Sequence, residues 1–325
     1  MAIHENDGQT RPGLKAPFVA LGLPVYNGEN FLARALESLL AQTFGDFEII
    51  LSDNGSTDGT EAICREYAAR DARIRYVRES RNRGVFWNFN RCFELSRSPL
   101  FRWTAHDDLC APTLLERCVE AMADRPGVVL CYPRTRIIGA DGEPKFEYGK
   151  RLRSDAADPA LRFHEEISED HACYHIFGLI RSDVLRRTSL MGAYAGADRN
   201  LLAELALLGP FYEIPEALFM RRDHPNTLSR KFRDVRDMAD YVHKTEARAE
   251  SQLIHIPTIR RALGYWDSLN RVPLSAQDRF ACLGVLGKWA MIRGRNWVAK
   301  RLTAPVREAH PGPMLVRADV AAAAQ

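Results

Sequence analysis

Short apolar runs alternate with amphipathic segments through the first 125 residues. The first run, from Phe18 to Tyr26, is continuous, which is typical of a strand buried on both faces of a parallel sheet. Residues 29–43 instead repeat their apolar positions at helical spacing, with Asn27 or Asn30 available as the N-cap. The same alternation then predicts strands at 47–52, 74–77 and 100–104, and helices from about 60 to 70 and over 86–95.

This order of elements predicts an α/β fold built on a doubly wound, mostly parallel sheet flanked by helices. In such sheets, ligands bind at the carboxyl ends of the strands. A polar cluster follows each of the four strands, at that same edge. Each cluster has an ordinary explanation when taken alone, as a helix cap, a turn or a solvated loop charge. Their convergence favours a binding site formed by Tyr26–Asn27, Asp53–Thr60, Arg81–Gly84 and His106–Asp108.

The second half of the chain continues with shorter elements. Apolar segments predict strands at 128–132 and 211–219, and Gly139–Gly142 predicts a hairpin turn before a strand at 145–148. Residues 149–165 are polar and predict a loop, either a mobile loop near the site or a plain surface loop.

His171 and His175 are four residues apart and could share one face of a helix. Hard, phosphate-linked cations do not favour imidazole ligands. We therefore interpret these two histidines as structural or acceptor-side residues.

From about 232 to 302 the pattern predicts helices that form a C-terminal extension. Around 284–302, basic residues interleave with Trp289 and Trp297, and no acidic residue occurs between Ala281 and Arg307. Two interpretations stay open: a helix that packs Trp289 on the domain and solvates its basic face, or a basic amphipathic helix on a membrane surface.

Composition narrows the class of protein. The 325 residues are 46% hydrophobic and carry a net charge of +3, so a sizeable core is expected and no nucleic-acid partner is indicated. The seven cysteines include no CxxC pair, which favours reduced thiols over a disulfide framework or a zinc site. Residues 1–16 are polar and predict a disordered lead-in without a secretory signal, and no apolar run could span a membrane. We expect a cytoplasmic protein, with peripheral contact at the inner face of the membrane if the basic helix binds there.

The sequence His106-Asp107-Asp108 is the strongest candidate for chemistry. Adjacent carboxylates point in different directions, so one could bind Mg²⁺ or Mn²⁺ while the other orients the loop. The alternative is an acidic pair that only complements a helix N-terminus. The chain has neither GxGxxG nor GxxxxGK[ST], so a nucleotide here must be held by side chains and a metal.

Four motifs, in this order along the chain, together resemble those of a known protein family. They are Pro24-Val25-Tyr26-Asn27, the run Asp53 to Thr60, Asn82-Arg83-Gly84, and Asp107-Asp108 with Pro112. In this combination the chain resembles a family 2 glycosyltransferase with a GT-A fold, strongly over residues 17–125 and more weakly to about 230. The resemblance implies transfer of a sugar from a nucleotide-sugar donor.

The resemblance also implies roles for the first three motifs. Pro24, Tyr26 and Asn27 correspond to the start of the nucleotide pocket. Asp53 corresponds to the aspartate that accepts a hydrogen bond from the base. The loop beside the ribose and base contains Arg81, Asn82 and Gly84.

At the fourth motif, Asp107 resembles the second carboxylate of the family's D-x-D, the one that binds the metal. The first carboxylate would fall on Ala105, so this sequence departs from the pattern. Asp108 and His106 are expected to support the donor site beside Asp107.

Later positions complete the implied site. Asp198 resembles the general base, although Ala197 replaces the glutamate that often precedes it; the plain alternative is a helix N-cap. Either Arg222 or His224 would neutralise the leaving diphosphate, or His224 would join the metal. A surface loop is the alternative for both residues.

These inferences predict an inverting glycosyltransferase that uses a UDP-linked donor, Mg²⁺ or Mn²⁺, and a glycan, lipid-linked or other acceptor hydroxyl. The predicted organisation is a nucleotide-sugar half (17–125), an acceptor half (126–231) and a helical extension (232–325). One alternative is a catalytically degenerate binding protein, motivated by Ala105 and Ala197. Another is a sugar nucleotidyltransferase, which normally needs a basic, glycine-rich loop after the first strand.

Overall fold

The computed structural model describes residues 16–168, 171–227 and 257–303. The predicted lead-in, apart from its last residue, and the predicted helical stretch 232–256 lie outside these residues.

One mixed sheet of nine strands organises the described chain, in the order β3-β2-β1-β4-β8-β6-β9-β5, with β7 paired to β6. The block β3-β2-β1-β4 is parallel throughout, and β6 and β9 are also parallel. The strands are β1 (Val19–Val25), β2 (Phe47–Asp53), β3 (Ile74–Arg78), β4 (Leu100–Trp103), β5 (Leu109–Cys110), β6 (Leu130–Ile138), β7 (Pro144–Glu147), β8 (Leu179–Arg181) and β9 (Phe211–Arg222).

Strand β1 lies at the centre of the parallel block, and all seven of its residues are buried. Leu21 and Leu23 pack into the core on one face of the sheet, whereas Ala20 packs into the core on the other. This alternation follows from the two-residue period of a strand. The prediction of a strand buried on both faces, made from the uninterrupted apolar run, is therefore confirmed.

Helices α1 (Leu32–Leu40), α2 (Thr60–Arg70) and α4 (Leu114–Asp124) supply the core on the first face. The second face carries α3 (Val85–Leu95), the one-turn helix η1 (Tyr174–Phe177), α6 (Ser182–Leu185) and α7 (Ala197–Leu208). The sheet is thus covered on both sides, and its carboxyl edge is left to the loops.

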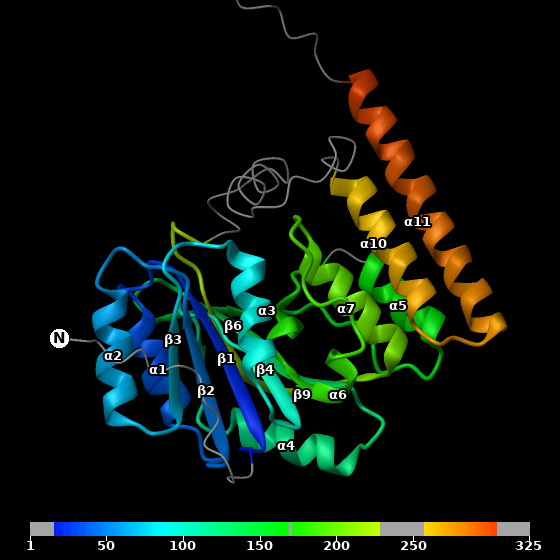
Figure 1. Cartoon of the computed structure of the whole chain (residues 1–325). Helices are drawn as coiled ribbons and strands as arrows, with labels where there is room; N and C mark the ends of the chain where they lie inside the picture. Colours follow the sequence, from blue (N-terminus) through cyan, green and yellow to red (C-terminus); the bar gives the residue numbers. More distant parts are fainter. Residues whose placement is uncertain (1–15, 169–170, 228–256, 304–325) are drawn as a thin grey trace, which may run out of the picture.

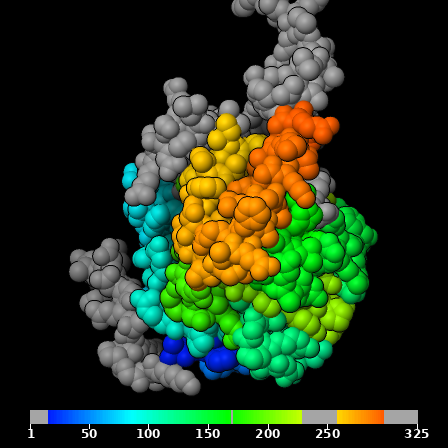
Figure 2. Space-filling view, turned by 90° about the vertical axis from the view of Figure 1, so that its right-hand side faces the viewer, coloured from blue at the N-terminus to red at the C-terminus, as the bar shows by residue number. Residues whose placement is uncertain are grey.

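A further helical layer lies outside α7. It comprises α5 (Pro159–Ser168), α10 (Pro257–Arg271) and α11 (Ala276–Thr303). These helices share a third core with α7, apart from the two cores on the faces of the sheet. Because α7 lies between two cores, nine of its twelve residues are buried. Figure 1 shows α10 and α11 at the end of the molecule opposite α2, and Figure 2 shows their yellow and orange atoms on the face that looks toward the viewer, beside green atoms.

The predicted parallel strands and their helices are confirmed to within a few residues. Three local predictions are wrong. Neither Asn27 nor Asn30 caps α1, whose N-cap is Phe31 without a side-chain hydrogen bond. The predicted loop 149–165 runs into helix α5 from Pro159. His171 and His175 do not share a helix face, because η1 begins only at Tyr174.

Candidate active site

The ends of β1 and β2 are joined by side-chain hydrogen bonds. The backbone N–H of Asn27 donates to Ser56 Oγ over 3.0 Å, and Thr57 N–H donates to Asn27 Oδ1 over 2.9 Å. Asn27 adopts a left-handed conformation with φ of 51°. A short amide side chain tolerates this conformation and can satisfy the neighbouring loop at the same time. The chain therefore turns sharply out of β1 at Asn27.

Asp53 lies at the end of β2 and is fully buried. Its Oδ1 accepts a hydrogen bond from Ser56 N–H over 2.8 Å, and its Oδ2 accepts bonds from the Tyr76 hydroxyl and Arg78 Nε, each over 3.1 Å. The parallel register places Arg78 directly opposite Asp53. Asp53 thus fixes the loop after β2, and a base could reach this carboxylate only if Tyr76 or Arg78 moved.

The loop after β3 closes against the loop after β2. Asn54 Nδ2 donates to Asn82 Oδ1 and to the Gly84 carbonyl, each over 2.9 Å, and Arg83 N–H donates to Asn54 Oδ1 over 3.0 Å. Gly55 adopts a φ of +74°, and a Cβ there would lie 2.7 Å from the Arg81 carbonyl carbon. Glycine is required at this contact because both the backbone angle and the space exclude a side chain.

After β4, Asp107 meets a residue more than a hundred positions away. His224 Nε2 lies 2.9 Å from Asp107 Oδ2, and the His224 ring packs on Phe31 with centroids 4.5 Å apart. Burial acts to raise the pKa of Asp107. The charge of His106 and the hydrogen bond from His224 outweigh burial and hold this pKa below its usual range.

Arg222 fastens the loop that contains Asp107. Its Nε donates to the Asp107 carbonyl over 2.8 Å, and its Nη1 donates to the carbonyls of Gly139 and Ala140. Its side chain is fully buried, and its Nη2 has no hydrogen-bond partner within the described ranges. Arg222 therefore positions the loop, whereas the sequence predicts a contact with the leaving diphosphate.

Asp108 faces the interior rather than the solvent. Its Oδ1 accepts a hydrogen bond from Arg222 N–H over 2.8 Å. Burial, together with the adjacent charge of Asp107, raises the pKa of Asp108 to about 8. The two neighbouring aspartates thus have opposite environments, and Asp108 supports the loop from behind.

Asp107 and His224 are suitable ligands for a divalent cation. One carboxylate oxygen and one imidazole nitrogen lie within 3 Å of each other at the end of the parallel block. Mg²⁺ and Mn²⁺ favour the carboxylate oxygen, and the imidazole nitrogen would be their less usual ligand. A surface hollow of about 450 Å³ borders His224 and is lined by the 139–145 turn and Asp223.

Asp198 lies in the first turn of α7, directly after Gly196 and Ala197. Gly196 adopts a φ of +87°, which lets the chain turn into the helix without strain. Asp198 is half-buried, and its Oδ1 accepts a hydrogen bond from Arg199 N–H over 2.8 Å. Its other carboxylate oxygen has no hydrogen-bond partner among the residues that the structure describes, and it can accept a further contact.

With this geometry in place, we compared the chain with known proteins. The sequence model "Glycosyl transferase family 2" matches residues 21–188, more than half of the chain. The chain belongs to glycosyl transferase family 2. The four motifs imply the same family.

Two curated relatives illustrate the family. The chain is 25% identical over 226 residues to chondroitin synthase of Escherichia coli, covering 68% of this chain and 31% of that protein. It is 35% identical over 221 residues to the uncharacterized glycosyltransferase EpsJ of Bacillus subtilis, covering 66% of this chain and 63% of that protein. The chain thus spans about a third of the first relative and less than two thirds of the second.

Solved structures show the fold. TarS 1–349 of S. aureus, in complex with UDP-GlcNAc, is 14% identical with a TM-score of 0.52, covering 83% of this chain and 80% of that one. The mannosyltransferase PcManGT of Pyrobaculum calidifontis, in complex with GDP-Man and Mn²⁺, is 17% identical with a TM-score of 0.52, covering 88% and 81%. The chain has the GT-A fold, which confirms the predicted fold class.

The family 2 motifs do converge at one edge of the sheet. The structure joins Asn27 to the loop after Asp53, joins that loop to Asn82 and Gly84, and joins Asp107 to His224. Pro24 is buried at the end of β1, whereas Tyr26 and Arg81 are exposed and His106 is half-buried beside Gly28. The individual roles of these residues remain predictions.

Sequence reasoning missed Tyr76, Arg78 and Phe31. The first two hold Asp53, and Phe31 packs on both His224 and the Arg222 guanidinium. The parallel order of β2 and β3 could have indicated Arg78, because it ends the strand next to Asp53. The sequence carries no comparable signal for Phe31, because its partners Arg222 and His224 come far later in the chain.

Proposed function

We propose that this family 2 enzyme transfers a sugar, with inversion, from a nucleotide diphospho-sugar to an acceptor hydroxyl, with UDP as the expected nucleotide. The observation that supports it best is the 2.9 Å approach of His224 Nε2 to Asp107 Oδ2 beside the nucleotide loops. The UDP-GlcNAc complex of TarS and the GDP-Man complex of PcManGT support a nucleotide-sugar donor. Tyr26, Asn82 and Gly84 would line the nucleotide, and Asp53 would fix the loops that hold it.

Asp107 and His224 would hold Mg²⁺ or Mn²⁺, with the carboxylate oxygen as the favoured ligand and the imidazole as the second one. When bound, the cation supplies Lewis-acid stabilisation of the leaving diphosphate. Ala105 provides no carboxylate, so His224 is the second protein ligand in this proposal. Arg222 would contribute by keeping the Asp107 carbonyl and loop in place, through its 2.8 Å hydrogen bond.

Asp198 is the proposed general base. An inverting transfer needs one group to take the proton of the acceptor hydroxyl as its oxygen attacks the anomeric carbon opposite the diphosphate. Positioning and charge stabilisation would then supply most of the rate.

The acceptor is proposed to be a hydroxyl of a glycan or of a lipid-linked saccharide. No helix in the described part of the chain is both long and apolar enough to cross a membrane. Helix α11 carries exposed apolar and basic side chains together, which supports peripheral contact with an anionic membrane surface. Such contact would bring the enzyme to a lipid-linked acceptor.

The decisive experiment is a screen of UDP- and GDP-sugars for slow donor hydrolysis with Mn²⁺, which needs no acceptor. We expect one donor to be hydrolysed and Asp107→Asn to lose more than about 100-fold of that activity. Asp124→Asn, on the exposed end of α4, is the matched control and should retain full activity. Hydrolysis that persists in excess chelator would remove the metal from the proposal, and a nucleotide-sugar bound without turnover would indicate a binding protein.

A further inference from the structure

Three potential metal ligands meet away from the proposed active site. They are Glu166 on α5, His171 in the following segment and His175 on η1. Their exposed fractions are 0%, 6% and 7%, so the cluster is buried. The proposed donor chemistry uses none of these side chains. A buried carboxylate with two imidazoles therefore needs its own explanation.

The spacing of the three groups suits a tetrahedral ion. His175 Nε2 lies 3.0 Å from Glu166 Oε2, and His171 Nε2 lies 3.6 Å from the same oxygen. One potential ligand atom from each residue lies within 4.8 Å of the other two. Ligands about 2.0–2.1 Å from a tetrahedral Zn²⁺ are separated by about 3.3 Å, between the two measured distances. His171 Nε2 also lies 3.1 Å from the backbone carbonyl oxygen of Glu166, so the ring must leave this contact to bind the ion.

The surroundings hold the carboxylate and both chain segments in place. Ser154 Oγ donates to Glu166 Oε1 over 2.8 Å, which leaves Oε2 directed at the histidines. Arg199 donates to the carbonyls of Glu166 and His171, so it ties both ligand-bearing segments to α7. Metal-binding carboxylates normally receive such outer hydrogen bonds. His171 Nδ1 is buried without a partner in the described part of the chain, so protein groups alone do not satisfy this ring.

A small cavity provides the fourth position. It borders His171 and His175 and is otherwise lined by side chains that include Tyr132, Tyr148 and Tyr174. About 30 Å³ is open to water-sized molecules, which is room for one or two waters. Three protein ligands with one position facing water is a common arrangement for zinc.

We propose that Glu166, His171 and His175 bind a borderline transition-metal ion of the zinc class, with water from the cavity as the fourth ligand. Two imidazoles and one carboxylate suit Zn²⁺, whereas a diphosphate-linked Mg²⁺ or Mn²⁺ prefers oxygen ligands. The ion joins α5 to η1 and, through Arg199, to the N-terminus of α7 beside Asp198. Its role is to fix the acceptor half rather than to take part in transfer.

The test uses the full chain, freed of metal with a chelator and dialysed against Zn²⁺, with bound metal measured by mass spectrometry. We expect about one Zn²⁺ per chain in the wild type and in Asp107→Asn. His175→Asn should weaken Zn²⁺ binding by roughly 100-fold or more. Equal Zn²⁺ content in His175→Asn, or a wild type that retains none, would overturn the proposal.

A second measurement does not depend on the folding of a variant. Co²⁺ replaces Zn²⁺ in tetrahedral sites and then absorbs strongly in the visible range, whereas six-coordinate Co²⁺ absorbs weakly. The wild type should show the strong bands, and added Zn²⁺ should abolish them. Weak bands, or strong bands lost in Asp107→Asn, would place the ion at the nucleotide loops and contradict this site.

Discussion

The adjacent residues Asp107 and Asp108 have the same side chain but lie in different environments. Asp107 meets His224 and has a lowered pKa, whereas Asp108 is buried behind it and has a raised pKa. Asp107 lies in the turn after β4 and Asp108 directly precedes β5, so one side chain faces the loops and the other the interior. The pair therefore provides one candidate ligand and one buried supporting group.

Asp108 should make stability depend on pH. Its folded pKa of about 8 lies above the ordinary 3.8, so the contribution of this group to stability is present below about pH 4 and is lost as pH rises through about 8. We expect the wild-type Tm, measured by calorimetry in metal-free buffer, to fall on the order of 2 °C between pH 6 and 9 from this group. Asp108→Asn keeps an oxygen for the Arg222 N–H and should lack this component. An identical pH profile in the variant would contradict the raised pKa.

Asp198→Asn tests the proposed base. The amide keeps the shape of the side chain but cannot take a proton, so kcat should fall by about 10²–10⁴-fold while the donor Kd stays unchanged. Asp183→Asn is the matched control, because Asp183 is an exposed acid in the first turn of α6. If Asp198 only stabilises the N-terminus of α7, both variants will show a slightly lower Tm and an unchanged kcat.

At the level of elements, the sequence predicts the parallel block well because its strands are buried on both faces and read as plain apolar runs. The same reasoning fails for α5. Arg162, Glu165 and Glu166 are buried there, and Arg162 donates to the Ala206 carbonyl while Glu166 binds histidine. Buried polar residues hide the apolar stripe that would have predicted a helix.

The sequence likewise predicts which loops meet, since carboxyl ends of parallel strands share one edge. It cannot predict that Asp53 is enclosed by Tyr76 and Arg78, because that depends on side-chain packing. The pairing of Asp107 with His224 came from the family resemblance. The local pattern around His224 equally permits a surface loop.

Gly55→Ala tests the contact between the loops after β2 and β3, which we propose to line the nucleotide. A Cβ at Gly55 meets the Arg81 backbone at 2.7–3.0 Å, and φ is +74°, so the loop must shift. We expect nucleotide affinity, measured by calorimetry, to fall about 10-fold, with a Tm lower by a few degrees. Gly45→Ala is the control, since nothing lies within 4 Å of a Cβ there. Equal nucleotide binding in the two variants would show that this contact does not shape the pocket.

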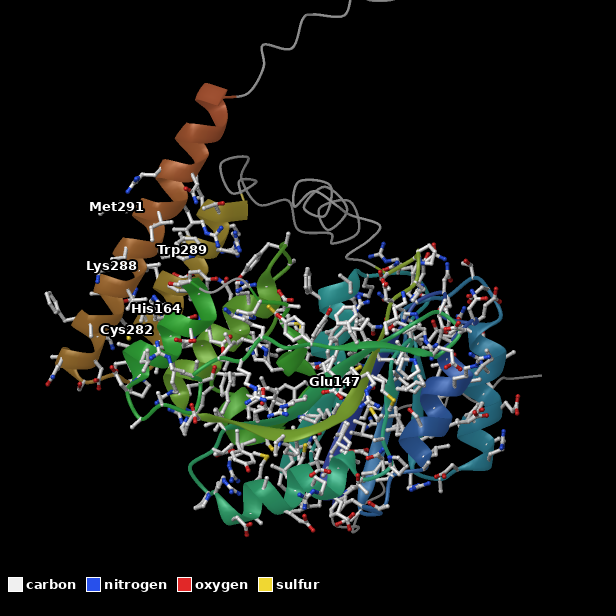
Figure 3. The ribbon with its side chains drawn as sticks, turned by 180° about the vertical axis from the view of Figure 1, so that it is seen from behind. Glu147, His164, Cys282, Lys288, Trp289 and Met291 are labelled. Atoms are coloured by element: carbon white, nitrogen blue, oxygen red, sulfur yellow. The ribbon has the colours of Figure 1, made fainter. Side chains whose placement is uncertain are left out.

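At the scale of the whole molecule, helix α11 reconciles two sequence interpretations. Trp289 is buried and packs edge-on against Tyr265 with ring centroids 5.3 Å apart, so the helix does dock on the domain. Phe280 and Met291 are 80% and 65% exposed, and they lie three turns apart on the opposite side. Figure 3 shows Trp289 toward α10 and Met291 outward. One face therefore packs on the enzyme while the other remains open.

The open face of α11 should bind anionic membranes. Lys288 and Arg295 flank the exposed Met291, and each cation near an anionic surface contributes about 1 kcal/mol. We expect the protein to sediment with phosphatidylserine vesicles but not with phosphatidylcholine vesicles, and to dissociate as salt rises, because ions screen the attraction. The double variant Lys288→Gln/Arg295→Gln should bind about 30-fold more weakly, since it loses two such contributions.

A matched control distinguishes binding through the exposed face of α11 from nonspecific adsorption of exposed apolar side chains. Met291→Ser should also reduce sedimentation, whereas Phe146→Ser, which removes a 60% exposed side chain on β7, should not. If neutral vesicles bind equally well, or if both serine variants behave alike, the basic side of α11 serves only to keep the helix solvated. If only the α11 variants lose binding, the surface that faces away from the sheet is the membrane-contacting surface of the enzyme.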